Sequence, residues 1–266
     1  MNNIVFGKYI PIDSALHRCD PRAKITALFL ILIAIFLPAG WYGFALIGAF
    51  LVIGLLIAKL RPGMVLKAFK PMLFMMLFLL VINIFSVKTG DLWFSWKFIN
   101  IYSDAVLNTL YIVIRLLLMV TLTTLLTATT KPLELTLGLE QLMKPLAKLH
   151  VPTHEIAMMI SIALRFIPTI IEETERIMNA QKSRGVDFDE GSLKEKISAI
   201  LSLIVPLFSV AFQRADDLAN AMEARGYVPG AERTRYKELI YQGRDHVLRI
   251  LSLLILAGTI VLAFVL

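Results

Sequence analysis

The stretch that decides the fold runs from Thr153 to Tyr227 and contains two segments with matching ends, NAQKSRG (Asn179–Gly185) and NAMEARG (Asn220–Gly226). The two ends are offset by about 41 residues, which is a weak internal repeat. Each segment begins apolar and turns charged over its last turns, so we predict two long helices, over 153–185 and 192–226. Each would be about 50 Å long, whereas the hydrocarbon core of a membrane is about 30 Å thick. One end of each helix therefore lies in or against a membrane while the other projects into water, as in a mechanical connector.

The composition is that of an integral membrane protein. Of the 266 residues, 58% are hydrophobic and only 18% are charged, and the mean hydropathy is +0.74. The net charge of +7 does not indicate nucleic-acid binding, because basic residues in a membrane protein with several spans mark its cytoplasmic loops. The single cysteine, Cys19, excludes an internal disulfide and suits a bacterial cytoplasmic membrane.

Hydropathy predicts an all-α polytopic fold with about five transmembrane helices. The expected spans are 25–37, 41–60, 71–87, 104–127 and 244–266. The distribution of lysine and arginine places the N-terminus, the loop after the second span and the region from 128 to the last span in the cytoplasm. The C-terminus is then external. We therefore divide the chain into transmembrane helices one to four (1–130), a cytoplasmic coupling domain (131–243) and a last transmembrane helix (244–266).

A leucine-rich segment, 131–150, precedes the first long helix. Its leucines recur at helical spacing, with charged residues mostly to the sides; they are Leu135, Leu139, Leu142, Leu146 and Leu149. Such an amphipathic helix lies along the membrane surface or against a partner helix. The alternative is that its leucine face packs on the protein's own core, and the sequence does not decide between the two.

Arg115 lies inside the fourth expected span. An ionisable residue there is by default a functional hypothesis, because placing an arginine at a helix centre costs about 2.5–3.5 kcal/mol on insertion scales. The alternative is a structural role, in which Arg115 hydrogen-bonds backbone or neighbours such as Asn108 inside the bundle.

The sequence contains no complete catalytic, metal or nucleotide motif. A phosphate-cradling loop of the form GxxxxGK[ST] is missing, and His154-Glu155 lacks the second histidine of a zinc-binding HExxH motif. We therefore expect no catalysis, no cofactor and no metal site in this chain. Two other functions were weighed: a membrane enzyme acting on lipid head groups through Glu172, Glu173, Asp216 and Asp217, and a self-sufficient carrier. Pro168 and Pro206 fall in the apolar halves of the long helices and are candidate hinges.

Each of the two arginine–glycine ends can be explained as a simple helix cap. Glycine takes the left-handed position after the helix, and the basic residue complements the negative end of the helix dipole. Two such ends, each on a helix too long for the bilayer, also favour a docking role. An arginine at an exposed end offers fixed donors suited to the carboxylates and carbonyls of another protein.

Taken together, these motifs resemble the transmembrane T component of energy-coupling factor (ECF) transporters. The resemblance covers the whole chain; it is carried by LRFIP (164–168), AQKSRG (180–185), EARG (223–226) and LEQLMKPL (139–146). Ser183 stands where the commonest form of the family's motif has alanine, as Ala224 does at the second end.

The resemblance implies a scaffold of bacterial cell membranes that has no substrate site of its own. Its coupling helices would cross, and their tips would dock into two ABC-type ATPases, expected to be a heterodimer. The docking residues would be Ser183, Arg184, Gly185, Ala224, Arg225 and Gly226. A separate S component would bind a vitamin or other micronutrient, and the leucines of 131–150 would face it.

Overall fold

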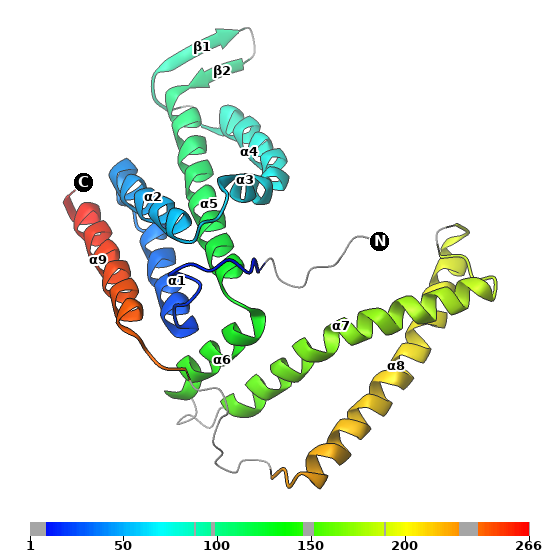
Figure 1. Ribbon diagram of the computed structural model, residues 1–266. Coiled ribbons are helices and arrows are strands. Elements are labelled where there is room, and N and C mark those ends of the chain that lie inside the picture. Colours follow the sequence, from blue (N-terminus) through cyan, green and yellow to red (C-terminus); the bar gives the residue numbers. More distant parts are fainter. Residues whose placement is uncertain are drawn as a thin grey trace. The chain divides into compact units, whose positions relative to one another are not determined.

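The computed structural model describes residues 9–87, 89–96, 99–145, 152–188, 190–228 and 239–265 (Figure 1). The described residues form two compact units. The first takes those within Met1–Thr153 and Leu239–Leu266, and the second takes those within His154–Glu238.

Four helices form the core of the first unit. They are α1 (Pro21–Phe36), α2 (Gly40–Ile57), α5 (Ser103–Thr129) and α9 (Gly243–Val265). The shortest of them, α1, packs against the other three and has half of its residues buried, Ile31 and Ile35 among them. Glycines allow close approach between helices: a Cβ on Gly54 of α2 would lie 3.2 Å from Leu125 of α5. Small residues at helix contacts are typical of membrane bundles, where dispersion forces rather than water drive association.

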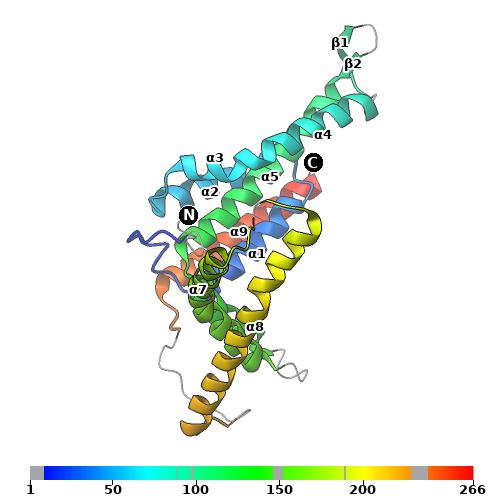
Figure 2. The same cartoon turned by 90° about the vertical axis from the view of Figure 1, so that its right-hand side faces the viewer.

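The third apolar segment is interrupted at Lys70-Pro71. It consists of α3 (Pro62–Phe69), a 3-10 turn η1 (Lys70–Met72) and α4 (Leu73–Ser86), which lies alongside α5 (Figure 2). The Asn83 side chain of α4 donates a hydrogen bond of 2.9 Å to the Thr109 hydroxyl of α5. A short antiparallel hairpin, β1 (Leu92–Trp96) and β2 (Ile99–Tyr102), joins α4 to α5. The sequence analysis did not predict this hairpin.

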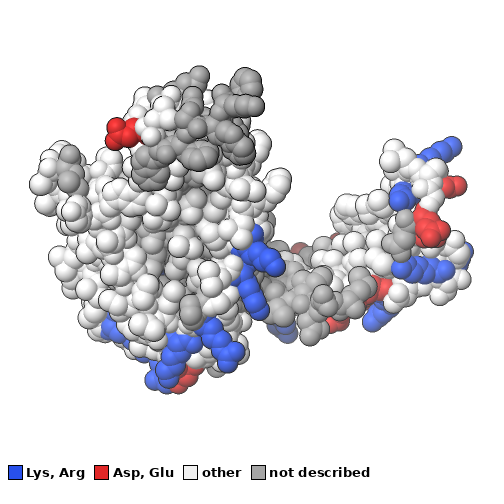
Figure 3. Space-filling model, turned by 90° about the horizontal axis from the view of Figure 1, so that it is seen from above, with Lys and Arg blue, Asp and Glu red and all other residues white. Residues whose placement is uncertain are grey.

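The prediction of an all-α polytopic membrane protein is confirmed. Among the residues that the structure describes, six helical segments are long and apolar enough to cross a membrane; they are 40–57, 63–86, 103–129, 153–183, 193–224 and 243–265. The first expected span is α1, which at 16 residues is shorter than these. Much of the apolar surface is exposed, as on Phe74 (81%) of α4, because lipid rather than water surrounds such a bundle. Seen from above, the described surface of the first unit is mostly uncharged, and its basic side chains lie at the edges (Figure 3).

A polar cluster fixes the end of the bundle at which α1 and α9 begin. Asp245, 1% exposed, accepts hydrogen bonds of 2.7 Å from the backbone N–H groups of Asp20 and of Gln242. The Asp20 side chain caps α1 and forms an ion pair of 2.8 Å with Arg22. Because both helices begin at this cluster, they run in the same direction. The C-terminus therefore lies at the opposite end of the bundle from the start of α1.

Lys24 joins the start of α1 to the end of α5 at the same level. Its ammonium group donates to the carbonyls of Thr129 (3.0 Å) and His17 (3.3 Å) and to the Thr130 hydroxyl (3.1 Å). All three ammonium protons thus have an acceptor. These hydrogen bonds stabilise the charge of Lys24, a residue that is only 5% exposed. We call the end of the bundle marked by Asp20, Lys24, Thr129 and Asp245 the basal end.

The second unit is built from two long helices, α7 (Thr153–Ser183) and α8 (Leu193–Ala224). They match the predicted 153–185 and 192–226 within two residues at each end. A capping box begins α8: the Glu195 N–H donates to the Ser192 hydroxyl (3.4 Å), and the Ser192 N–H donates to the Glu195 carboxylate (2.7 Å). Pro168 and Pro206 lie inside continuous helices.

Candidate functional site

The two long helices end in the same backbone motif. At the end of α7, the N–H of Val186 donates to the Gln181 carbonyl (3.0 Å) and that of Gly185 to the Lys182 carbonyl (3.0 Å). At the end of α8, the N–H of Tyr227 donates to Met222 (2.9 Å) and that of Gly226 to Glu223 (2.8 Å). Each pair of bonds is a Schellman motif, with glycine in the left-handed position and the arginine as the C-cap residue. The sequence repeat is therefore also a structural repeat.

Both glycines are required by backbone conformation. Gly185 has φ +88 and Gly226 has φ +72, and a Cβ at either position would meet nothing within 4 Å. The open space around them leaves the arginines that precede them, Arg184 and Arg225, exposed. Neither guanidinium has a hydrogen bond or an ion pair with the described residues. Each helix thus ends in an exposed, positively charged tip.

An ion pair joins α7 to α8 where the two helices approach each other. Arg214 of α8 donates a hydrogen bond of 2.9 Å to the Glu173 carboxylate of α7, and the two side chains are 33% and 17% exposed. Arg176 contacts the same carboxylate at 3.4 Å, but its side chain is 75% exposed. Glu173 and Arg214 are separated by the same 41 residues as the two tips. Each tip consequently lies about 16 Å along its helix from this pair.

A second cross-link uses a backbone carbonyl that a proline has left without a helical donor. Pro206 has no N–H, so the carbonyl of Ser202, four residues earlier, lacks its helical partner. The Gln181 side chain of α7 donates to this carbonyl at 3.2 Å. The backbone carbonyl of Gln181 also accepts the hydrogen bond from the Val186 N–H that closes the cap of the first tip. The first tip is therefore connected directly to the N-terminal third of α8.

Sequence reasoning did not find either cross-link. Glu173 was named only among the four acids of a possible membrane enzyme, although the 41-residue offset that it shares with Arg214 was a usable signal. Gln181 stood inside a quoted motif, and Pro206 was considered only as a hinge. Neither residue by itself indicates a partner, because the bond joins a side chain to a main-chain atom 21 residues away.

The amphipathic segment is observed as α6 (Pro132–Met143), which packs on α1. A Cβ on Gly138 would lie 3.0 Å from the Pro21 Cβ, and Thr136 and Glu140 are buried. Leu139 is 42% exposed, and Leu135 and Leu142 are only half-buried. Leu139 is therefore available at the surface of the first unit, whereas Leu135 and Leu142 are partly covered. Leu146 and Leu149 lie outside the described residues.

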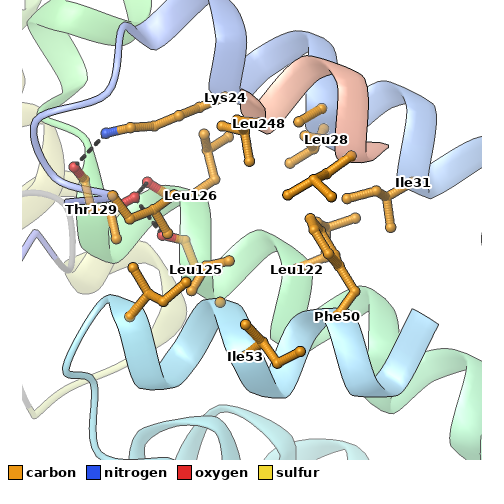
Figure 4. A pocket seen from close by; sticks show the side chains of 15 residues that line it. Lys24, Leu28, Ile31, Phe50, Ile53, Leu122, Leu125, Leu126, Thr129 and Leu248 are labelled. Carbon is orange, nitrogen blue, oxygen red and sulfur yellow. Dashed lines mark hydrogen bonds between the residues drawn. The ribbon is translucent and has the colours of Figure 1, made fainter. Parts of the chain in front are cut away.

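A cavity of about 220 Å³ lies among α1, α2, α5 and α9. Figure 4 shows apolar side chains such as Leu28, Phe50 and Leu122 around this space, with Lys24 and Thr129 hydrogen-bonded to each other at one end. The polar groups that reach the cavity are thus already paired. Its lining suits an apolar group rather than a hydrophilic substrate.

The four acids considered for an enzyme differ in their surroundings. Glu173 is engaged by Arg214 and Arg176, whereas Glu172, Asp216 and Asp217 are exposed. Within the described part of the chain, no three His, Cys, Asp or Glu side chains are grouped so as to hold a metal ion.

Comparison with known proteins gives a consistent picture. Residues 13–236 match the CbiQ family, described as cobalt transport protein. The chain is 43% identical over 258 residues to the energy-coupling factor transporter transmembrane protein EcfT of Bacillus subtilis, covering 97% of each protein. The chain belongs to the EcfT/CbiQ family of ECF transporter T components. The EcfT of Lactococcus lactis is 41% identical over 98% of each chain, and that of Macrococcus caseolyticus is 44% identical over 92% of each.

Membership in this family confirms the resemblance seen in the sequence. The protein is the transmembrane component of an ECF transporter, a multi-pass membrane protein that works in a complex with other subunits. The roles of the tips, of the α6 leucines and of the two prolines are not given by this membership alone.

Proposed function

We propose that this T component is the non-catalytic coupling scaffold of an ECF importer, and that its two tips dock into two ABC-type ATPases. The observation that carries the proposal is the identical cap at the ends of α7 and α8, each leaving one arginine exposed. A guanidinium in such a position can donate several hydrogen bonds to a partner at once. Two equivalent tips fit two similar ATPase subunits, which form either a homodimer or a heterodimer.

The cross-links between α7 and α8 support a mechanical role. The Glu173–Arg214 pair and the Gln181–Ser202 bond connect the helices between the tips. Movement of one tip is thereby transmitted to the other helix rather than lost in bending. Closure of an ATPase pair around ATP would displace both tips, and packed helices pass on such a displacement by switching between arrangements. Pro168 and Pro206 are the proposed hinges.

We propose that the moving helices act on a membrane-embedded S component, which selects the vitamin or other micronutrient. The leucine face of α6, on which Leu139 is exposed and Leu135 and Leu142 are half-buried, is the proposed contact. In support, Gly138 packs on α1 while Leu139 is left 42% exposed at the surface of its own unit.

The basal end would face the cytoplasm, with the C-terminus outside. Supporting this orientation, basic residues cluster in the chain segments that reach the basal end, whereas the turn between α1 and α2 at the other end carries no charge.

The docking proposal is tested by Arg184→Ala, Arg225→Ala and the double variant, with the ATPases and an S component co-expressed. A charge-assisted contact contributes about 1.5–3 kcal/mol, so each single variant should weaken ATPase co-purification about 10- to 100-fold and the double variant should abolish uptake. Arg176→Ala is the matched control, because Arg176 is an exposed arginine on α7 away from its tip. Normal ATPase co-purification and uptake in the double variant would refute the docking role.

The contact with the S component is tested by cysteine cross-linking. A cysteine at Leu139 should cross-link to the S component, whereas one at Phe264, which is 88% exposed on α9, should not. Equal cross-linking at both positions would show that exposure alone, rather than a specific face, determines the product.

A further inference from the structure

Arg115 is an arginine on a membrane-spanning helix for which the described residues provide no polar partner. Its Nε atom is buried without a hydrogen bond, and its guanidinium forms no ion pair or hydrogen bond with the described part of the chain. This finding does not support the expectation that Arg115 bonds backbone or residues such as Asn108. An unpaired charge inside an otherwise apolar span is costly, and such residues mark sites that something else completes.

The surroundings of Arg115 are aromatic. Its guanidinium carbon lies 5.0 Å from the ring centre of Tyr111, 5.8 Å from that of Phe36 and 6.0 Å from that of Phe44. The Trp41 ring contacts Tyr111 edge-on at 5.8 Å. These rings hold the guanidinium through cation–π attraction but leave its N–H groups without acceptors.

The depth of this cluster places it near the end of the bundle opposite the basal end. The stretch from Arg115 to Thr129 rises about 21 Å, and Thr129 is level with Lys24 at the basal end. Helical side chains point toward the N-terminus of their helix, so that of Arg115 points further from the basal end, toward Tyr111. A core about 30 Å thick therefore ends within several Å of the guanidinium. Trp41 (44% exposed) and Tyr42 (69% exposed) mark the same level, as interfacial aromatic residues do.

We propose that Arg115 and its aromatic cluster bind the phosphate of an anionic phospholipid in the leaflet opposite the basal end. A phosphate offers the planar bidentate acceptors that a guanidinium fits, and it lies at this depth in every phospholipid. Exposed apolar side chains close to the site, such as Phe36 (58% exposed), provide surface for the attached acyl chains. The competing occupant is a carboxylate from a partner subunit. The lipid is favoured because interfacial aromatic side chains surround the cluster.

The test uses the full chain purified in detergent and titrated with phosphatidylglycerol, with binding followed by native mass spectrometry and by the shift in Tm. We expect Arg115→Gln to weaken phosphatidylglycerol binding about tenfold or more and to reduce the stabilisation. Arg115→Lys keeps the charge but loses bidentate bonding, so its affinity for phosphatidylglycerol should lie between those of the wild-type chain and of Arg115→Gln. Lys67→Gln is the matched control, because it removes the same charge from an exposed position on α3 and should change the affinity less than twofold.

Two further arms identify the source of the phosphate. Inorganic phosphate at the same concentration should not stabilise the wild-type chain, and phosphatidylcholine should bind more weakly than phosphatidylglycerol. Equal effects of Arg115→Gln and Lys67→Gln would show diffuse electrostatic attraction and overturn the proposal. An Arg115→Gln variant that binds lipid normally but loses its partner subunits would overturn it in favour of a partner carboxylate. Because lipid binding by the chain alone needs no ATPase, failure here leaves the docking of the tips untouched.

Discussion

Replacing Arg214 by glutamine should loosen the second unit, because this arginine is half of the ion pair that joins α7 to α8. Arg214 and Glu173 are 2.9 Å apart with side chains 33% and 17% exposed, which is intermediate between a surface pair and a buried one. Exposed pairs contribute about 0.2–1 kcal/mol, whereas breaking a buried pair costs about 3–5 kcal/mol. We therefore expect Arg214→Gln to lower the local opening free energy of the helix pair by about 1–2 kcal/mol.

Hydrogen exchange measured by mass spectrometry on the full chain in detergent reports this local opening directly. A loss of 1–2 kcal/mol corresponds to exchange that is about 5- to 30-fold faster in peptides from both α7 and α8. The chain provides its own control, since Arg176 contacts the same Glu173 carboxylate from an exposed position. Arg176→Gln should change exchange less than about twofold.

Three results would refute the reasoning. The first is equal acceleration by Arg214→Gln and Arg176→Gln, which would mean that burial does not distinguish the two contacts. The second is acceleration confined to α8, which would mean that the pair does not join the helices. The third is strict additivity of Arg214→Gln and Glu173→Gln in a double-mutant cycle, which would leave no coupling between the two side chains.

Three further predictions concern the caps, the packing of α6 and pH. Gly185→Ala should destabilise the last turn of α7 by about 1 kcal/mol through its positive φ alone, and Gly226→Ala should do the same for α8; local hydrogen exchange would measure both. Gly138→Ala should lower the Tm, because its Cβ would lie 3.0 Å from a Cβ of α1. Gly63→Ala is the control and should leave the Tm unchanged, because a Cβ there would have nothing within 4 Å. Equal Tm values for the two variants would contradict the packing of α6 on α1. Burial lowers the pKa of His17, whose Nε2 donates to the Ile10 carbonyl, below its usual 6.5. The unfolded chain then binds more protons than the folded one just below pH 6.5, so stability should fall as the pH is lowered through 6.5. The fall should be smaller in His17→Gln, as Tm measured across this pH range would show.

Much of the fold followed from local features of the sequence. Hydropathy is a property of composition within a window, so the long helices and four of the five expected spans could be located to within a few residues. The third expected span, 71–87, was wrong at its start, because the observed segment begins at 63 and the basic residues Lys67 and Lys70 lie within it. The matching ends of α7 and α8 also follow from local chemistry, because a Schellman motif involves only six consecutive residues and a glycine that accepts a positive φ. Arg184 and Arg225 could therefore be singled out from the sequence before any tertiary contact was known.

Contacts between distant residues were decided only by the tertiary structure. Asp245 accepts the N–H of Asp20 across 225 residues, and Gln181 pairs with a carbonyl that is unpaired only because Pro206 follows it. Helical periodicity showed that α6 has a leucine face but not which face packs on α1, because that depends on the neighbour's shape at Gly138. The aromatic cluster around Arg115 likewise assembles from α1, α2 and α5. Such arrangements depend on which helices become neighbours, and a pattern within one helix does not contain that information.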